Sequence, residues 1–130
     1  MAHILVIDDN IVNLKLTSCV LEQAGHTVLT AVNGELGIDL ALHTPTDLVL
    51  LDVLMPGMDG ITTLRRLRSN PQTALLKVIA LSALRQQQDA PGILAAGFDG
   101  YCEKPVHYKK LLLEVESTLH ANRGATDTAR

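Results

Sequence analysis

Residues that can do chemistry follow four of the five short apolar segments of this 130-residue chain. Asp8 and Asp9 come after the first segment, and Asp52 comes after the third. Ser82 follows the fourth segment and Lys104 follows the fifth, whereas the second segment ends without a charged residue. If the segments lie side by side, three carboxylates meet. Each like-charge pair then costs roughly 4 kcal/mol at about 4 Å and an effective dielectric of about 20.

Such a group of carboxylates must take up protons or bind a hard cation. A few oxygen ligands, with room left for water and phosphate oxygens, suit Mg²⁺ better than a fully enclosed Ca²⁺. Zinc is disfavoured because the histidines, at positions 3, 26, 43, 107 and 120, show no paired spacing on one helix. The sequence therefore predicts Mg²⁺ as the cofactor.

A carboxylate beside Mg²⁺ can attack a phosphoryl group and form an acyl phosphate. That chemistry needs a metal, a cation opposite it and a hydroxyl donor. Asp9 and Asp52 can hold the metal, Lys104 can supply the cation and Ser82 the hydroxyl. The sequence contains no glycine-rich nucleotide-binding motif, so the phosphoryl group is expected to come from a partner protein or a small donor.

Alternating apolar runs and helical patterns predict an α/β fold with a parallel sheet and right-handed crossovers. We expect a doubly wound, flavodoxin-like sheet of five strands in the order 2-1-3-4-5, with five helices on its two faces. The expected strands are His3–Ile7, His26–Ala31, Asp47–Leu51, Lys77–Leu81 and Gly100–Glu103. The expected helices are Asn10–Ala24, Gly34–His43, Gly60–Arg68, Asp89–Ala96 and Tyr108–His120. Gly25 and Gly97 are expected to cap helices in the left-handed conformation. One domain is expected over residues 1–121, with a flexible tail at 122–130.

Composition excludes several other classes of protein. A net charge of −3 and 2% aromatic residues argue against direct nucleic-acid binding. The three arginines of the third predicted helix, Arg65, Arg66 and Arg68, are interpreted as a solvated face. No apolar run is long enough for membrane insertion, and two widely spaced cysteines favour a reducing, cytoplasmic location.

Four runs of the sequence resemble the response-regulator receiver domain of two-component signalling, and the resemblance covers about residues 3–120. The runs are LVIDDN at Leu5–Asn10, LLDVLMPGMDG at Leu50–Gly60, ALSA at Ala80–Ala83 and FDGYCEKP at Phe98–Pro105. Each run alone is modest evidence, but four in order at receiver spacing are specific.

The resemblance implies a role for each matching residue. Asp52 would accept the phosphoryl group, Asp9 would bind Mg²⁺ directly and Asp8 would act mainly through water. The backbone carbonyl of Leu54 would complete the metal shell. Ser82 stands where the family carries Thr or Ser, and Lys104 matches the family's lysine.

The resemblance also implies a switch. Tyr101 matches the aromatic switch position, and the bond between Lys104 and Pro105 is expected to be cis. The readout face would be formed by the fourth helix, the fifth strand and the fifth helix. Its partners would be a histidine kinase or a histidine phosphotransfer protein, and a downstream protein target.

Two apolar positions lead to a prediction about signal lifetime. Leu54 and Leu84 lie two residues after Asp52 and Ser82, where family members influence the attacking water. Since neither side chain can orient water, slow self-dephosphorylation is expected.

Several alternatives stay open at this point. The chain is expected to be a stand-alone signalling phosphoacceptor, not an enzyme, and a monomer or a phosphorylation-dependent dimer. It could also be a receiver excised from a hybrid kinase or a longer regulator. A phosphohydrolase with an aspartyl nucleophile is disfavoured because Leu54 occupies the place of the required acid, and a pseudo-receiver because the acidic and lysine positions are intact.

Overall fold

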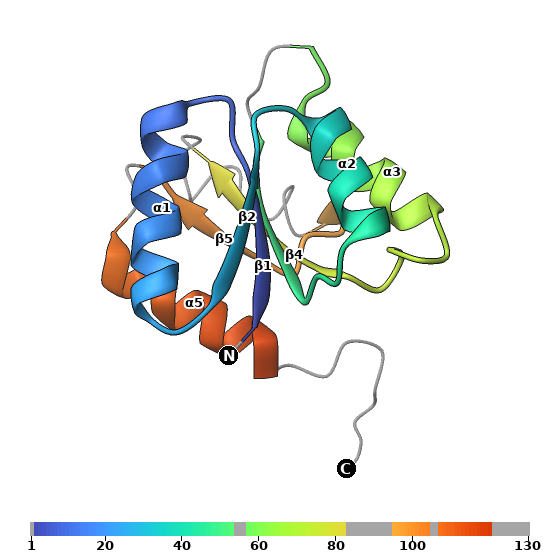
Figure 1. The fold of residues 1–130 in the computed structure, drawn as a ribbon. Helices are drawn as coiled ribbons and strands as arrows, with labels where there is room; N and C mark the ends of the chain where they lie inside the picture. The colour runs from blue at the N-terminus through green and yellow to red at the C-terminus, as the bar shows by residue number, and fades with distance from the viewer. Residues whose placement is uncertain (1, 54–56, 83–94, 105–106, 121–130) are drawn as a thin grey trace.

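Five parallel strands form one sheet in the order β2-β1-β3-β4-β5, as predicted (Figure 1). The computed structural model describes residues 2–53, 57–82, 95–104 and 107–120. The strands are β1 (His3–Ile7), β2 (Thr27–Ala31), β3 (Leu48–Asp52), β4 (Lys77–Ser82) and β5 (Gly100–Glu103). Within the described ranges the helices are α1 (Ile11–Gln23), α2 (Gly34–His43), α3 (Gly60–Ser69) and α5 (Tyr108–His120). The helix predicted at Asp89–Ala96 falls almost wholly outside the described residues.

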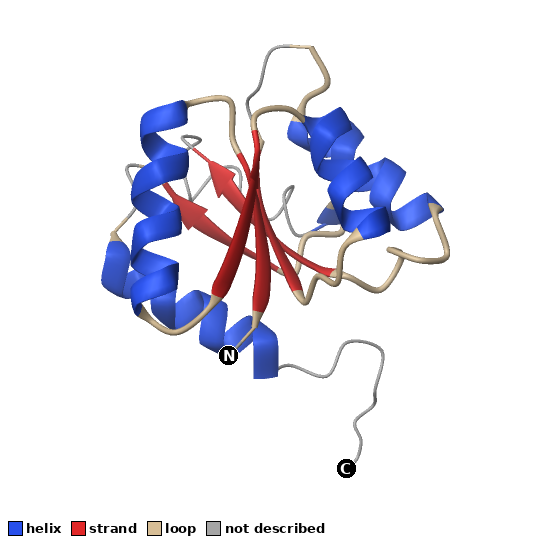
Figure 2. Cartoon of the chain, viewed as in Figure 1, coloured by secondary structure: helices blue, strands red, loops and turns tan. Residues whose placement is uncertain are grey.

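The sheet separates two apolar cores, and Figure 2 shows helices on both of its faces. Alternate residues of the central strands point to opposite faces, so Leu5 and Ile7 contact one core while Ile4 and Val6 contact the other. Leu64 and Leu67 of α3 pack in the first core, together with residues of α2. Helices α1 and α5 cover the second. Burial on both faces explains why these strands read as continuous apolar runs.

Local signals fix the helix ends. The side chains of Asn10, Asn33 and Asp59 each accept a backbone N–H of the first turn of α1, α2 and α3, as N-caps do. Gly25 and Gly97 have φ values of +99° and +113°, which confirms the predicted left-handed conformation. No helix of the described residues is both long and apolar enough to cross a bilayer.

Two strand starts differ from the prediction by one residue, and each has a tertiary cause. β2 begins at Thr27 and not at His26, whose Nδ1 accepts the N–H of Ala2 at 3.2 Å and whose own N–H donates to the Leu21 carbonyl at the end of α1. β3 begins at Leu48 and not at Asp47, whose carboxylate accepts the N–H of His3 at 2.8 Å. Polar contacts at the amino end of the sheet therefore hold these two residues outside the strands.

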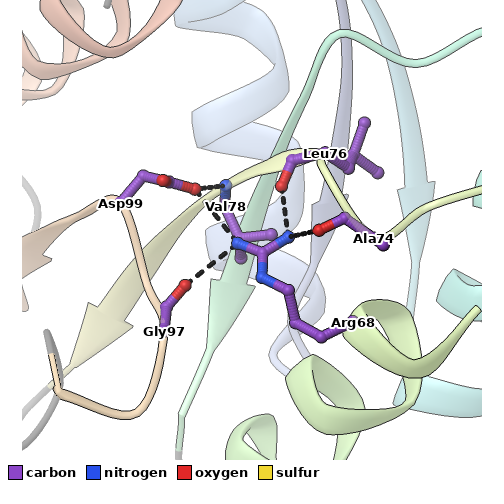
Figure 3. A network of polar contacts seen from close by, with 6 residues as sticks. All are labelled: Arg68, Ala74, Leu76, Val78, Gly97 and Asp99. Carbon is purple, nitrogen blue, oxygen red and sulfur yellow. Dashed lines mark hydrogen bonds and ion pairs between the residues drawn. The ribbon is translucent and has the colours of Figure 1, made fainter. Parts of the chain in front are cut away.

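The interpretation of Arg68 as a solvated residue is wrong. Only 18% of its side chain is exposed, and its guanidinium donates to backbone carbonyls and to the carboxylate of Asp99 (Figure 3). Arg65 and Arg66 are exposed, as predicted. The arginine lies one residue after the buried Leu67, which brings it to the edge of the apolar face of α3.

Candidate functional site

Four of the side chains predicted to converge meet at the carboxyl end of the sheet, namely those of Asp8, Asp9, Asp52 and Lys104. Asp8 follows β1, Asp52 is the last residue of β3 and Lys104 follows β5. One carboxylate oxygen from each of Asp8, Asp9 and Asp52 lies within 4.8 Å of the others. We call these three residues the acidic cluster. The Nζ atom of Lys104 lies 3.0 Å from Oδ2 of Asp8 and 3.1 Å from Oδ2 of Asp52.

Backbone hydrogen bonds hold the acidic cluster in place. The N–H of Asp8 donates to the carbonyl of Ala31 in β2, and its Oδ1 accepts the N–H of Asn10 at 2.9 Å. Beyond Asp52, the N–H of Val53 donates to the carbonyl of Leu81 in β4. The two buried aspartates are thereby fixed to the ends of neighbouring strands.

Gly60 lets α3 approach the end of β3 closely. A Cβ atom at this position would lie 2.5 Å from the carbonyl oxygen of Asp52 and 2.6 Å from the Cα of Val53. No ordinary side chain fits against rigid backbone at such distances, so the glycine is required by the packing. This role was not predicted from the sequence, although a glycine directly after the N-cap Asp59 was a signal that could have indicated it.

Charge is unbalanced in the acidic cluster. Asp8 and Asp52 are 1% and 3% exposed, whereas Asp9 is exposed to solvent. Burial raises the pKa of Asp52 to about 6, since the loss of hydration and the nearby Asp8 outweigh the attraction of Lys104. Burial alone would lower the pKa of Lys104, but its hydrogen bonds and attraction to Asp8 and Asp52 raise it above the ordinary value.

This donor set suits a hard divalent cation. All three groups offer carboxylate oxygens, which Mg²⁺ prefers, and the exposed Asp9 leaves one side of the cluster open to water. Two buried carboxylates face one lysine, so an added positive charge would offset the desolvation and the repulsion from Asp8 that raise the pKa of Asp52. Asp8, Asp9 and Asp52 could therefore hold Mg²⁺ in the predicted manner.

The other predicted site residues are described only in part. Ser82 is the last residue of β4 and pairs with Glu103 in β5, but its side chain is outside the description. Tyr101 is half-buried in β5 and packs against the core that α2 and α3 cover. The predictions for Leu54, Leu84 and the bond to Pro105 fall outside the described residues.

Comparison with known proteins gives one consistent family. The family described as "Response regulator receiver domain" matches residues 4–116. The chain is 34% identical to protein PilH of Pseudomonas aeruginosa over 92% of its own length and 98% of that protein. It is 40% identical to the DNA-binding dual master transcriptional regulator RpaA of Synechocystis, where it spans only about half (49%) of the relative.

A solved structure agrees in fold. The receiver domain of a sensor histidine kinase from Pseudomonas aeruginosa superposes with a TM-score of 0.84 at 27% identity. The match covers 92% of this chain and 98% of that domain, whose structure holds a magnesium ion coordinated in its active-site cleft.

Proposed function

Because the chain belongs to the response regulator receiver family, we propose that it is a phosphorylation switch with Asp52 as the phosphoacceptor. The observation that carries the proposal is the position of Lys104, whose Nζ lies about equally close to the buried carboxylates of Asp8 and Asp52. A cation there can pair with the oxygens of a phosphoryl group as that group arrives. The donor would be a histidine kinase or a histidine phosphotransfer protein of the cytoplasm.

Transfer requires Asp52 to be ionised and in line with the donor. One of its carboxylate oxygens forms the new bond to phosphorus as the bond from phosphorus to the donor nitrogen breaks. The donor imidazole keeps the electron pair of that bond. With a pKa of about 6, Asp52 is largely ionised at neutral pH, so no separate base is needed.

The acidic cluster would supply a site for Mg²⁺. The similar receiver domain of a sensor histidine kinase supports this, because its structure holds a magnesium ion in the active-site cleft. Asp8, Asp9 and Asp52 would hold the ion, together with the backbone carbonyl of Leu54. When bound, Mg²⁺ neutralises charge on the transferring phosphoryl oxygens.

Phosphorylation is large enough in energy to act as a switch. Hydrogen bonds to charged groups contribute about 1.5–3 kcal/mol each, so new bonds from Ser82 and Lys104 give roughly 3–6 kcal/mol. Reversing a two-state equilibrium from 1:99 to 99:1 takes about 5.5 kcal/mol. We propose that movement of Ser82 toward the phosphate lets Tyr101 turn inward.

The face that reports this change includes β5 and α5. A groove of about 720 Å³ lies along it, lined by Tyr101, Lys104 and Leu113 among others, and Leu113 is 71% exposed. The segment predicted as a helix at Asp89–Ala96 would complete the face. A downstream protein, or a second phosphorylated copy of the chain, would bind there.

The test is incubation with acetyl phosphate and Mg²⁺, followed by intact mass measurement. The parent should gain one phosphoryl group, and Asp52→Asn should gain none. Asp47→Asn is the matched control, since Asp47 is an exposed aspartate at the opposite end of the sheet, and it should react as the parent does. A phosphoryl group on Asp52→Asn would overturn the assignment. Steady release of phosphate over many turnovers would favour a hydrolase instead.

The lifetime of the phosphorylated state is a second part of the proposal. Leu54 and Leu84 offer no group that orients water, so loss of phosphate should be slow. Leu54→Asn or Leu84→Glu should accelerate that loss in a chase experiment after removal of acetyl phosphate. Unchanged rates in both variants would show that these positions do not control the lifetime.

A further inference from the structure

Arg68 joins three segments at the amino end of the sheet, opposite the end that carries the acidic cluster. Its Nη1 donates to the carbonyl oxygens of Ala74 and Leu76, in the loop that leads to β4. Its Nη2 donates to the carbonyl oxygen of Gly97 at 2.9 Å and to Oδ2 of Asp99 at 3.1 Å (Figure 3). We call this arginine and its four partners the Arg68 network. It fixes the backbone that leads into β5 to α3 and to the start of β4.

Asp99 determines where β5 begins to pair with β4. Its N–H donates to the carbonyl of Val78, and its Oδ2 accepts the N–H of Val78, both at 2.8 Å. From there the two strands pair residue by residue as far as Ser82 and Glu103. Among the described residues β5 pairs only with β4, and it is four residues long, so few bonds hold its register.

The register of β5 decides where Lys104 lies. A strand rises about 3.3 Å per residue, so a slip of one residue would move the lysine by about that distance. The same slip would turn each side chain of the strand to the other face. Lys104 can then no longer keep Nζ at 3.0 and 3.1 Å from Asp8 and Asp52.

We infer that Arg68 is a positioning residue for phosphoryl transfer. By fixing Asp99, and through it the register of β5, it places Lys104 beside Asp52. This inference rests on the proposed function of Asp52 and Lys104. The role then belongs to an arginine at the opposite end of the sheet from the acidic cluster.

Two conservative variants test the inference while keeping a polar side chain at each substituted position of the Arg68 network. Arg68→Lys keeps the charge, but one ammonium group cannot donate to all the acceptors that the two Nη atoms of the guanidinium reach. Asp99→Asn keeps an acceptor for the N–H of Val78 and removes the charge that faces Arg68. Arg66→Lys is the matched control, because Arg66 is an exposed arginine of the same helix. Circular dichroism identifies a temperature at which every variant is folded.

The measured quantity is the rate of phosphoryl transfer from acetyl phosphate to Asp52, a step that releases acetate. Arg68→Lys and Asp99→Asn should react roughly 10- to 100-fold more slowly, since small displacements of a catalytic group have effects of this size. Arg66→Lys should react as the parent does. Mg²⁺ affinity should stay near the parent value, because the acidic cluster lies on other strands. Backbone amide resonances of Gly100–Glu103 should shift, while those of β1 and β3 stay in place.

A double-mutant cycle that combines Arg68→Lys with Lys104→Ala separates an effect on the position of Lys104 from general destabilisation of the fold. Without the lysine, Arg68→Lys should cause little further loss of rate, because the group that it positions is gone. Parental rates in both Arg68→Lys and Asp99→Asn would overturn the inference. So would equal losses of rate with and without Lys104, or weaker Mg²⁺ binding with shifts throughout the sheet. If Lys104→Ala reacts as fast as the parent, the proposed function of the lysine fails, whatever the arginine variants do.

Discussion

At the carboxyl end of the sheet one lysine faces three carboxylates, whereas at the amino end Arg68 faces one carboxylate and three backbone carbonyls. Both arrangements bring a basic side chain against aspartate in a largely buried setting. At the amino end both Nη atoms of Arg68 donate to oxygen acceptors and Asp99 matches its charge, and Lys77 likewise donates to the carbonyl of Leu119 near the end of α5. At the carboxyl end negative charge is left in excess. The excess of negative charge at the carboxyl end indicates a place for a ligand. The balanced charges at the amino end indicate a structural contact.

The largest expected effect on stability comes from a substitution at the amino end of the sheet, where the charges of Arg68 and Asp99 balance. Arg68→Met leaves the carbonyls of Ala74, Leu76 and Gly97 without their donor and leaves Asp99 without its cation. It should lower the free energy of unfolding by roughly 3–5 kcal/mol, the usual range when one partner of a buried pair is removed. Urea denaturation measures this change. Arg66→Met should stay within about 0.5 kcal/mol of the parent, and a similar loss in both variants would mean that the network adds nothing specific.

Asp52→Asn removes a charge from the acidic cluster and should raise the free energy of unfolding, by an amount that depends on pH. Burial raises the pKa of Asp52 from 3.8 to about 6, so between these values the folded protein holds a proton that the unfolded chain has released. Without Mg²⁺, the free energy of unfolding should therefore fall as the pH rises through this window, by roughly 2–3 kcal/mol relative to Asp52→Asn. The measurement is denaturation of both proteins in EDTA from pH 4 to pH 7.5. Parallel curves would contradict the prediction.

Mg²⁺ should raise the free energy of unfolding by binding to the acidic cluster at the carboxyl end of the sheet. At a Mg²⁺ concentration ten times the dissociation constant, linkage predicts a gain of roughly 1.4 kcal/mol in the free energy of unfolding. Asp9→Asn should remove most of that gain with little effect on the metal-free protein, because Asp9 is exposed. Thermal denaturation with and without Mg²⁺ tests this. Equal gains in the two proteins would exclude Asp9 as a ligand.

The smallest effect should come from an aspartate that lies near the acidic cluster in sequence but serves the fold. Asp59 caps α3, and its Oδ1 accepts the N–H of Thr62 at 2.8 Å. This hydrogen bond holds the pKa of Asp59 below its ordinary value. Asp59→Ala should cost about 1 kcal/mol of stability, as the loss of an N-cap does, and leave Mg²⁺ affinity unchanged. A large fall in affinity would add Asp59 to the metal site.

Much of the fold could be predicted because the core strands are apolar on both faces. The bounds of β1, β5, α2 and α5 agree with the prediction, and at α2 the N-cap Asn33 marks the start of the helix. The starts of β2 and β3 were misplaced by one residue because His26 and Asp47 make contacts with residues far away in the sequence. No local pattern reports such contacts.

The convergence of Asp8, Asp9, Asp52 and Lys104 was also predictable, because parallel strands bring their carboxyl ends to one edge. The role of Arg68 was not. Its partner Asp99 is 31 residues further along the chain, and a long basic side chain on a helix usually points to water. The backbone carbonyls that it binds cannot be identified from residue types, because every residue has one.

The separation of Lys104 from Asp8, 96 residues along the chain, has a consequence for biosynthesis. The ribosome synthesises Asp8, Asp9 and Asp52 well before it synthesises Lys104. In a nascent chain that ends before β5, folding of the earlier strands would bring the three carboxylates together without the lysine that attracts them. The last strand to be synthesised is thus the one that reduces the repulsion at the carboxyl end of the sheet.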